Sequence, residues 1–231
     1  MFRDSGYYFI ALFGAGVAAF WPKYISRPAA EIDAYTHVHA AAMVAWCALL
    51  IAQPFLIRAR RRSLHRALGV LSYGLAPAVV IASVLLAHYR FRSMDDSTFV
   101  SEARNLYLPL STLVLFCIAY GCGILYRRRP ELHARFMVCT SLTMIDPVLG
   151  RILAFYLPPL PDYLYYQGVT YGLTDVILLS LAIRDRGRPQ ARWVFPTMLA
   201  LFMAAHAMWF TWAQADAWLV IASWFRRVPL T

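Results

Sequence analysis

Seven apolar runs alternate with short polar segments along this chain of 231 residues. A helix needs about 20 residues to cross a hydrocarbon core, and each run reaches or nearly reaches that length. A further apolar run, 217–225, is too short to cross; we expect an interfacial helix with Trp218 and Trp224 at headgroup depth. The pattern predicts an all-α, integral-membrane helical bundle in which residues 1–231 form a single domain. The predicted spans are 7–22, 35–57, 67–88, 105–126, 136–157, 164–183 and 193–214.

The composition makes the lipid bilayer the main partner of the chain. Apolar residues make up 61% of the sequence and charged residues 15%, which is too little polar surface for a water-soluble domain. The net charge of +10 comes from arginines clustered in short loops beside the apolar runs. That arrangement follows the positive-inside rule and is not a nucleic-acid-binding stripe, so we expect no nucleic-acid partner.

Lysine and arginine counts predict the orientation. Three loops hold five, four and four of these residues, at 58–66, 127–135 and 184–192. The loops on the opposite side hold two, three and none, at 23–34, 89–104 and 158–163. We therefore expect a multi-pass protein of the bacterial inner membrane, with a cytoplasmic N-terminus and the C-terminal tail outside.

Two histidines begin predicted spans directly after arginine-rich loops. His65 enters the third span and His133 the fifth, so both imidazoles lie at the same cytoplasmic depth on non-adjacent helices. This placement suits a bis-histidine b-type haem, with Arg66 and Arg135 pairing with its propionates. The alternative is that both are interfacial residues that cap helices or touch lipid headgroups.

The other histidines form a second group of candidate ligands. His37, His39 and His88 lie at the outer face, and His206 lies roughly 20 Å into the seventh span. Together they are candidates for a transition metal ion, and His39 and His88 for an outer haem. Interfacial histidines without a ligand remain the alternative.

Three charged residues fall inside predicted spans. Asp146, Arg151 and Asp175 lie on the fifth and sixth spans, which a short loop makes neighbours. A cluster of the three would satisfy charges that are costly in lipid, either as a catalytic proton path or polar pocket, or as a purely structural ion network. Pro147 is expected to kink the fifth span and make room for a cavity.

One set of motifs runs from the second to the fifth span, less than half of the chain. It consists of His39, Gln53, His65-Arg66-Ala67-Leu68-Gly69 and Arg129-Pro130-Glu131-Leu132-His133-Ala134-Arg135-Phe136-Met137. This set resembles a pattern found in uncharacterised bacterial polytopic membrane proteins, and more distantly the ascorbate-reducible transmembrane cytochrome b family.

The cytochrome resemblance implies a four-helix core with two b haems and ligand histidines on alternate helices. His65 and His133 would be one such pair. His39 would need a partner between residues 105 and 126, a stretch that contains no histidine. The chain therefore departs from the family at the second haem.

Three functions follow as hypotheses. The first is a membrane redox protein with one b-type haem, exchanging electrons with a quinone or a haem protein partner. The second is a metal-dependent seven-helix enzyme, such as a lipid hydrolase, that uses the outer histidines. The third is a non-catalytic subunit or assembly factor of a larger membrane complex. The sequence contains no phosphate-binding loop, nucleophile motif or dinucleotide fingerprint, so whether the chain is an enzyme stays open.

Overall fold

The computed structural model describes residues 4–157 and 163–231, and every regular element in these ranges is helical. Two short turns of helix, Trp21–Ile25 and Ala103–Leu106, extend the end of α1 and the start of α5. The α-helices of the described ranges are α1 (Ser5–Phe20), α2 (Ala34–Arg58), α3 (Arg62–Arg92), α4 (Asp96–Glu102), α5 (Tyr107–Leu125), α6 (Pro130–Leu142), α7 (Ile145–Tyr156), α8 (Tyr163–Arg184), α9 (Val194–Phe210) and α10 (Asp216–Arg227).

Seven helical stretches are long and apolar enough to cross a membrane, which confirms the predicted architecture. They cover the predicted spans to within one residue and extend several of them at the ends. The stretches are Ser5–Ile25, Ala34–Arg58, Arg62–Arg92, Asp96–Leu125, Pro130–Tyr156, Leu164–Arg184 and Val194–Gln214.

The fifth span is broken in the middle, as Pro147 predicts. Helix α6 ends at Leu142 and α7 begins at Ile145. A proline ring clashes with the carbonyl four residues before it, which here belongs to Thr143. The break therefore falls where the clash would occur, and it sets Asp146 in the first turn of α7.

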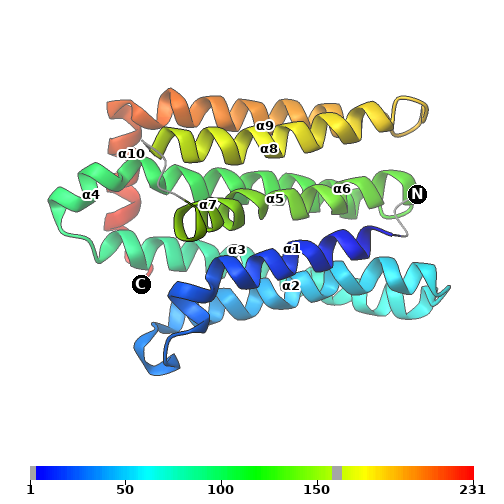
Figure 1. Cartoon of the computed structure of the whole chain (residues 1–231), viewed down its shortest axis with the longest axis horizontal. Coiled ribbons are helices and arrows are strands. Elements are labelled where there is room, and N and C mark those ends of the chain that lie inside the picture. The colour runs from blue at the N-terminus through cyan, green and yellow to red at the C-terminus, as the bar shows by residue number, and fades with distance from the viewer. Residues whose placement is uncertain (1–3, 158–162) are drawn as a thin grey trace.

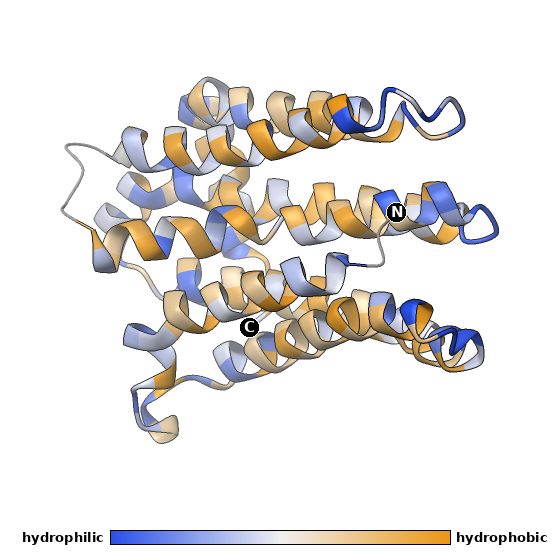
Figure 2. Ribbon diagram, turned by 45° about the vertical axis from the view of Figure 1, so that its right-hand side comes forward, coloured by the Kyte–Doolittle hydropathy of each residue, from blue (hydrophilic) through white to orange (hydrophobic). Residues whose placement is uncertain are grey.

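Consecutive helices pair into antiparallel hairpins, α2 with α3, α5 with α6 and α8 with α9, while α1 lies against α2 and α7 (Figure 1). The three loops that join these hairpins are the arginine-rich ones, and they lie together at the end of the bundle that also holds the N-terminus. Figure 2 shows hydrophilic residues at these loops and apolar residues along the helices. We call this end of the molecule the arginine-rich end.

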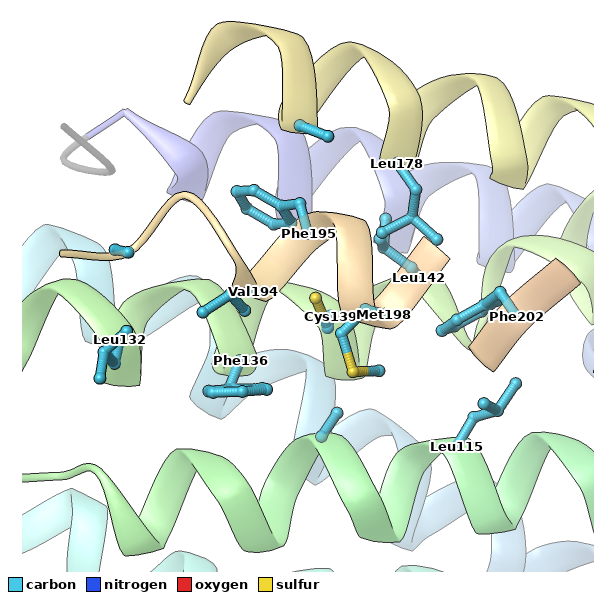
Figure 3. Close-up of a cluster of buried hydrophobic side chains, with 13 residues drawn as sticks. Leu115, Leu132, Phe136, Cys139, Leu142, Leu178, Val194, Phe195, Met198 and Phe202 are labelled. Atoms are coloured by element: carbon cyan, nitrogen blue, oxygen red, sulfur yellow. The ribbon is translucent and has the colours of Figure 1, made fainter. Parts of the chain in front are cut away.

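Buried apolar side chains gather in three clusters. One joins α5, α6, α8 and α9 and includes Phe136, Cys139 and Met198 (Figure 3). A second lies at the other end of the bundle, under α10, and a third joins α1, α2, α3 and α5 around Trp46. Because lipid tails are as apolar as these side chains, close packing rather than escape from water holds the helices together.

The predicted C-terminal helix is present as α10, but its tryptophans differ in environment. Trp224 is 66% exposed. Trp218 is buried, and its indole Nε1 donates to the carbonyl oxygen of Ala103 at 2.9 Å. The side of α10 that carries Trp218 therefore packs on the end of the bundle, and the side that carries Trp224 is exposed.

A buried ion pair ties the arginine-rich end together. The Arg135 guanidinium on α6 donates to the carboxylate of Asp185, which follows α8, and the two side chains are 1% and 0% exposed. Nη1 of Arg135 also donates to the carbonyl oxygen of Glu131 at 2.7 Å. The 184–192 loop therefore does more than mark topology, because it neutralises a charge on another helix.

Removing one partner of this pair should destabilise the fold strongly. Arg135→Ala leaves the Asp185 carboxylate buried and unneutralised, so we expect a loss of about 3–5 kcal/mol in the free energy of unfolding. The exposed pair of Arg58 with Asp4 gives the matched control, because Arg58→Ala should cost less than about 1 kcal/mol. Unfolding in detergent micelles measures both; equal losses for the two variants would contradict the role of the buried pair.

Candidate functional site

His65 and His133 occupy equivalent places at the arginine-rich end. Each is the fourth residue of its helix, α3 for His65 and α6 for His133. Both side chains are partly buried. The sequence predicts that His65 and His133 lie at the same depth. In the structure both are in the first turns of helices that begin at the arginine-rich end and are not consecutive in the chain.

The imidazole of His133 is held by the neighbouring helix. Its Nδ1 lies 2.8 Å from the carbonyl oxygen of Gly123 on α5. A carbonyl can only accept, so the ring carries a proton on Nδ1, and in the neutral ring Nε2 keeps a lone pair. Glycine permits the close approach, because a Cβ at position 123 would lie 3.0 Å from Sδ of Met137.

His65 lies beside an incompletely satisfied glutamine. Nε2 of Gln53 on α2 donates to the backbone carbonyl of His65 at 3.3 Å. Within the described ranges, Gln53 Oε1 and His65 Nδ1 are both buried without a hydrogen-bond partner. An acceptor and a ring nitrogen are thus unsatisfied in neighbouring side chains, which is costly unless a small rotation or a bound group pairs them.

The two arginines proposed for haem propionates differ. Arg66 is exposed at the arginine-rich end, next to His65. Arg135 instead has its guanidinium engaged by Asp185 inside the protein. We therefore withdraw Arg135 as a propionate partner and assign it the structural role of holding α6.

The outer histidines have separate partners and do not form one centre. His37 uses both ring nitrogens, at 3.0 Å from the Tyr24 hydroxyl and 3.0 Å from the carbonyl oxygen of Ala29. The Nδ1 atom of His39 lies 3.1 Å from the hydroxyl of Ser83 on α3.

His88 is fully buried, with Nδ1 at 2.7 Å from the Thr231 hydroxyl. In the part of the chain that the structure describes, no group of three or more His, Cys, Asp or Glu side chains is arranged to hold a metal ion. The outer histidines thus lack the convergent ligand set that a metal centre requires.

His206 joins the midplane charges instead. Its Nδ1 lies 3.1 Å from Oδ2 of Asp175 on α8, and its ring stacks on Tyr171 with centroids 3.9 Å apart. His206 was predicted to join the outer histidines, and its contact with Asp175 was not predicted. The signal that could have found it is simple: a histidine deep in lipid needs a polar partner on the adjacent span.

Asp146 and Arg151 extend from the first two turns of α7. The Thr170 hydroxyl on α8 donates to Oδ1 of Asp146 at 2.5 Å. Arg151 donates to the carbonyl oxygen of Pro147 at 2.7 Å, and its guanidinium lies 4.5 Å from the centre of the Phe20 ring. The ion pair of the midplane group therefore joins Asp175 to His206, and Asp146 is held by a hydroxyl.

Asp146 and His206 border the same small cavity, whose volume is about 20 Å³. Hydroxyl-bearing residues of α5, of α8 and of the break between α6 and α7, together with several apolar side chains, complete its wall. The lining residues are Ser111, Thr112, Leu115, Leu142, Thr143, Asp146, Tyr171, Thr174, Phe202, Ala205 and His206.

The described residues thus present two candidate sites, a histidine pair at the arginine-rich end and a polar cavity at mid-depth. The histidine pair offers two imidazoles at one end of the bundle, and the cavity has the acid and base groups of a proton site. The chain matches no family model, no curated protein and no solved structure, so a functional assignment depends on this geometry alone.

Proposed function

We propose that this chain is an integral-membrane redox protein that holds a b-type haem between His65 and His133 and passes electrons to or from a quinone or a haem protein. One observation carries the proposal: the first turns of α3 and α6 lie at the same, arginine-rich end of the bundle, and each turn carries a histidine as the fourth residue of its helix. Imidazole is the usual axial ligand of haem iron.

The state of His133 supports this assignment. Ligand histidines generally donate the second ring N–H to a carbonyl or carboxylate, which fixes the tautomer and orients the ring. The hydrogen bond from His133 Nδ1 to Gly123 has this form and leaves Nε2 available. His133 is thus prepared as a ligand by a backbone group that a side-chain substitution would not remove.

The surroundings of His65 fit the same arrangement. His65 Nδ1 and Gln53 Oε1 are both without a hydrogen-bond partner in the described ranges. The amide oxygen of Gln53 is the kind of acceptor that a protonated Nδ1 needs. If Nε2 of His65 binds the iron, the ring proton stays on Nδ1. The Nδ1–H group would then donate a hydrogen bond to Oε1 of Gln53. Exposed Arg66 would then offer a guanidinium to an acidic group at the membrane surface.

A bound haem would supply one-electron chemistry, while the protein supplies orientation, charge and exclusion of water. The buried pair of Arg135 with Asp185 begins two residues after His133 and holds the first turns of α6 in place. The aromatic side chains of Trp46, Phe116 and Tyr120 pack between α2 and α5.

A metal-dependent enzyme at the outer face receives less support, because His37, His39 and His88 each have a different partner. A subunit or assembly role in a larger complex would leave the histidine pair without a ligand. The spectrum described next separates that role from the redox function.

Purified wild-type protein, reduced and oxidised, should give the paired absorption bands of a six-coordinate b-type haem. His65→Ala and His133→Ala should each abolish these bands, because each removes an axial ligand. His37→Ala is the matched control and should keep them, since both nitrogens of His37 are used by Tyr24 and Ala29.

Protein that stays folded, is supplied with haem and shows no such bands would exclude this function. Bands that survive both ligand substitutions would place the haem elsewhere. Gln53→Leu should keep the haem but shift its reduction potential, because leucine cannot accept the proposed hydrogen bond from Nδ1 of His65.

We further propose that the protein lies in the inner membrane of a bacterium and that its arginine-rich end is on the cytoplasmic side. Ser63→Cys lies in the 58–66 loop and Ser26→Cys in the 23–34 loop, and both positions are exposed. A membrane-impermeant thiol reagent applied to intact spheroplasts should label the Ser26→Cys variant and leave the Ser63→Cys variant unlabelled. The reverse result would overturn this orientation.

A further inference from the structure

We infer that the cavity between α5, α7, α8 and α9 is an intramembrane proton site, in which Asp146 and His206 exchange a proton through one water molecule. The site uses different residues from the proposed haem site and does not depend on a haem being bound. His206 lies about 12 Å along the helix from Gln214, where the seventh span ends. Asp146 lies about 15 Å from the end of α7 at Tyr156, so both groups are inside the hydrocarbon region.

His206 is fixed as one partner of this exchange. Its Nδ1 is engaged by Asp175, and its ring is held between Tyr171, at 3.9 Å, and Phe202, at 5.8 Å between centroids. With Nδ1 engaged, Nε2 is the nitrogen left to gain or lose a proton. The stacking prevents the ring from turning away from the cavity.

Asp175 offsets part of the cost of protonating His206 in lipid. Its second oxygen, Oδ1, is buried without a partner among the described residues. A carboxylate with so few hydrogen bonds is poorly stabilised in a medium of low dielectric constant, and an imidazolium beside it offsets that cost. When His206 is protonated, it forms an ion pair with the Asp175 carboxylate. When the proton leaves Nε2, the two residues stay joined by the Nδ1–H hydrogen bond.

Asp146 is the other partner. Thr170 donates to its Oδ1, which leaves Oδ2 as the oxygen that carries or releases a proton. Carboxylate–histidine couples of this kind are the proton-relay groups of membrane proteins. The titratable residues that line the cavity are Asp146 on α7, Tyr171 on α8 and His206 on α9. Asp175 on α8 reaches the site through its contact with His206, and Arg151 on α7 donates to the carbonyl oxygen of Pro147.

The cavity has the size and chemistry for one water molecule. A water needs at least 10–15 Å³ of this kind of volume and two to four polar partners, and about 20 Å³ is present. The hydroxyls of Ser111, Thr112, Thr143 and Thr174 each donate to a backbone carbonyl of their own segment. Their oxygen lone pairs are then left to accept from the water.

The apolar wall isolates this water from the arginine-rich end. Leu115 of α5 and Phe202 of α9 approach each other at one end of the core cluster, and both border the cavity (Figure 3). Protons should therefore move within the site faster than they leave it.

The transfer conserves charge and atoms. Oδ2–H of Asp146 gives its proton to the water, and the water gives one of its own protons to Nε2 of His206. The products are the Asp146 carboxylate and an imidazolium whose Nδ1–H stays on the Asp175 carboxylate. One proton has moved from α7 to α9, and the net charge of the site is unchanged.

Infrared and ¹⁵N NMR titrations of the full chain in lipid nanodiscs test the site. The wild type should show a carboxylic-acid C=O band that disappears as pH rises, together with a change in the His206 ring signals. Asp146→Asn should remove the band and move the His206 midpoint by about one pH unit or more, because interacting groups titrate as a coupled pair. Asp96→Asn, at an exposed carboxylate on α4, is the matched control and should change neither.

Two further variants keep the test decisive. Thr170→Val removes the hydrogen bond to Asp146 and should shift the carboxylic-acid band without abolishing it. Asp175→Asn should lower the pH at which His206 gains its second proton, because the carboxylate that stabilises the imidazolium is lost. If Asp146 remains ionised over the whole titration, or if His206 titrates identically in wild type and Asp146→Asn, the proposed site is wrong. If Asp146→Asn fails to fold, an unshifted band in Thr170→Val would overturn it.

Discussion

The absence of water in the bilayer core is the constraint on which this structure depends. Backbone groups there must bond within the chain, so the described part of the protein crosses as helices. Polar side chains obey the same rule: Arg135 meets Asp185, His206 meets Asp175, and Asp146 meets Thr170. Each of these contacts joins residues 24 or more positions apart. The groups that are most costly in lipid therefore fix how the helices sit against one another.

The same rule links the scaffold to the histidine pair. Arg135 is two residues beyond His133 on α6, and Asp185 anchors it from the segment that follows α8. Gly123 admits α5 closely enough for its carbonyl to meet the His133 ring. The orientation of this imidazole is therefore set from two sides, by a buried charge and by a backbone carbonyl. A histidine required only for packing would not need a buried charge and a backbone carbonyl to orient its ring.

Hydropathy and charge counts were sufficient to predict the seven spans and the C-terminal helix, because span length and lipid solubility depend on local composition. The break before Pro147 was also predictable, since a proline acts on its own helix. The pairing of Arg135 with Asp185 was not, because it depends on which helices become neighbours. His206 was misassigned for a related reason: its contact with Asp175 depends on how α8 and α9 face each other, which hydropathy does not determine.

The distance between the two sites limits how strongly they can act on each other. Asp146 is thirteen residues beyond His133, or roughly 20 Å along the broken span. Two unit charges at that separation interact by about 0.8 kcal/mol at an effective dielectric constant of about 20, which is about a fourfold change in an equilibrium constant. An electron arriving at the arginine-rich end would thus bias protonation at the cavity only weakly. Tight coupling of electron and proton transfer would require helix movement, and the break between α6 and α7 is where the span that joins the two sites can bend.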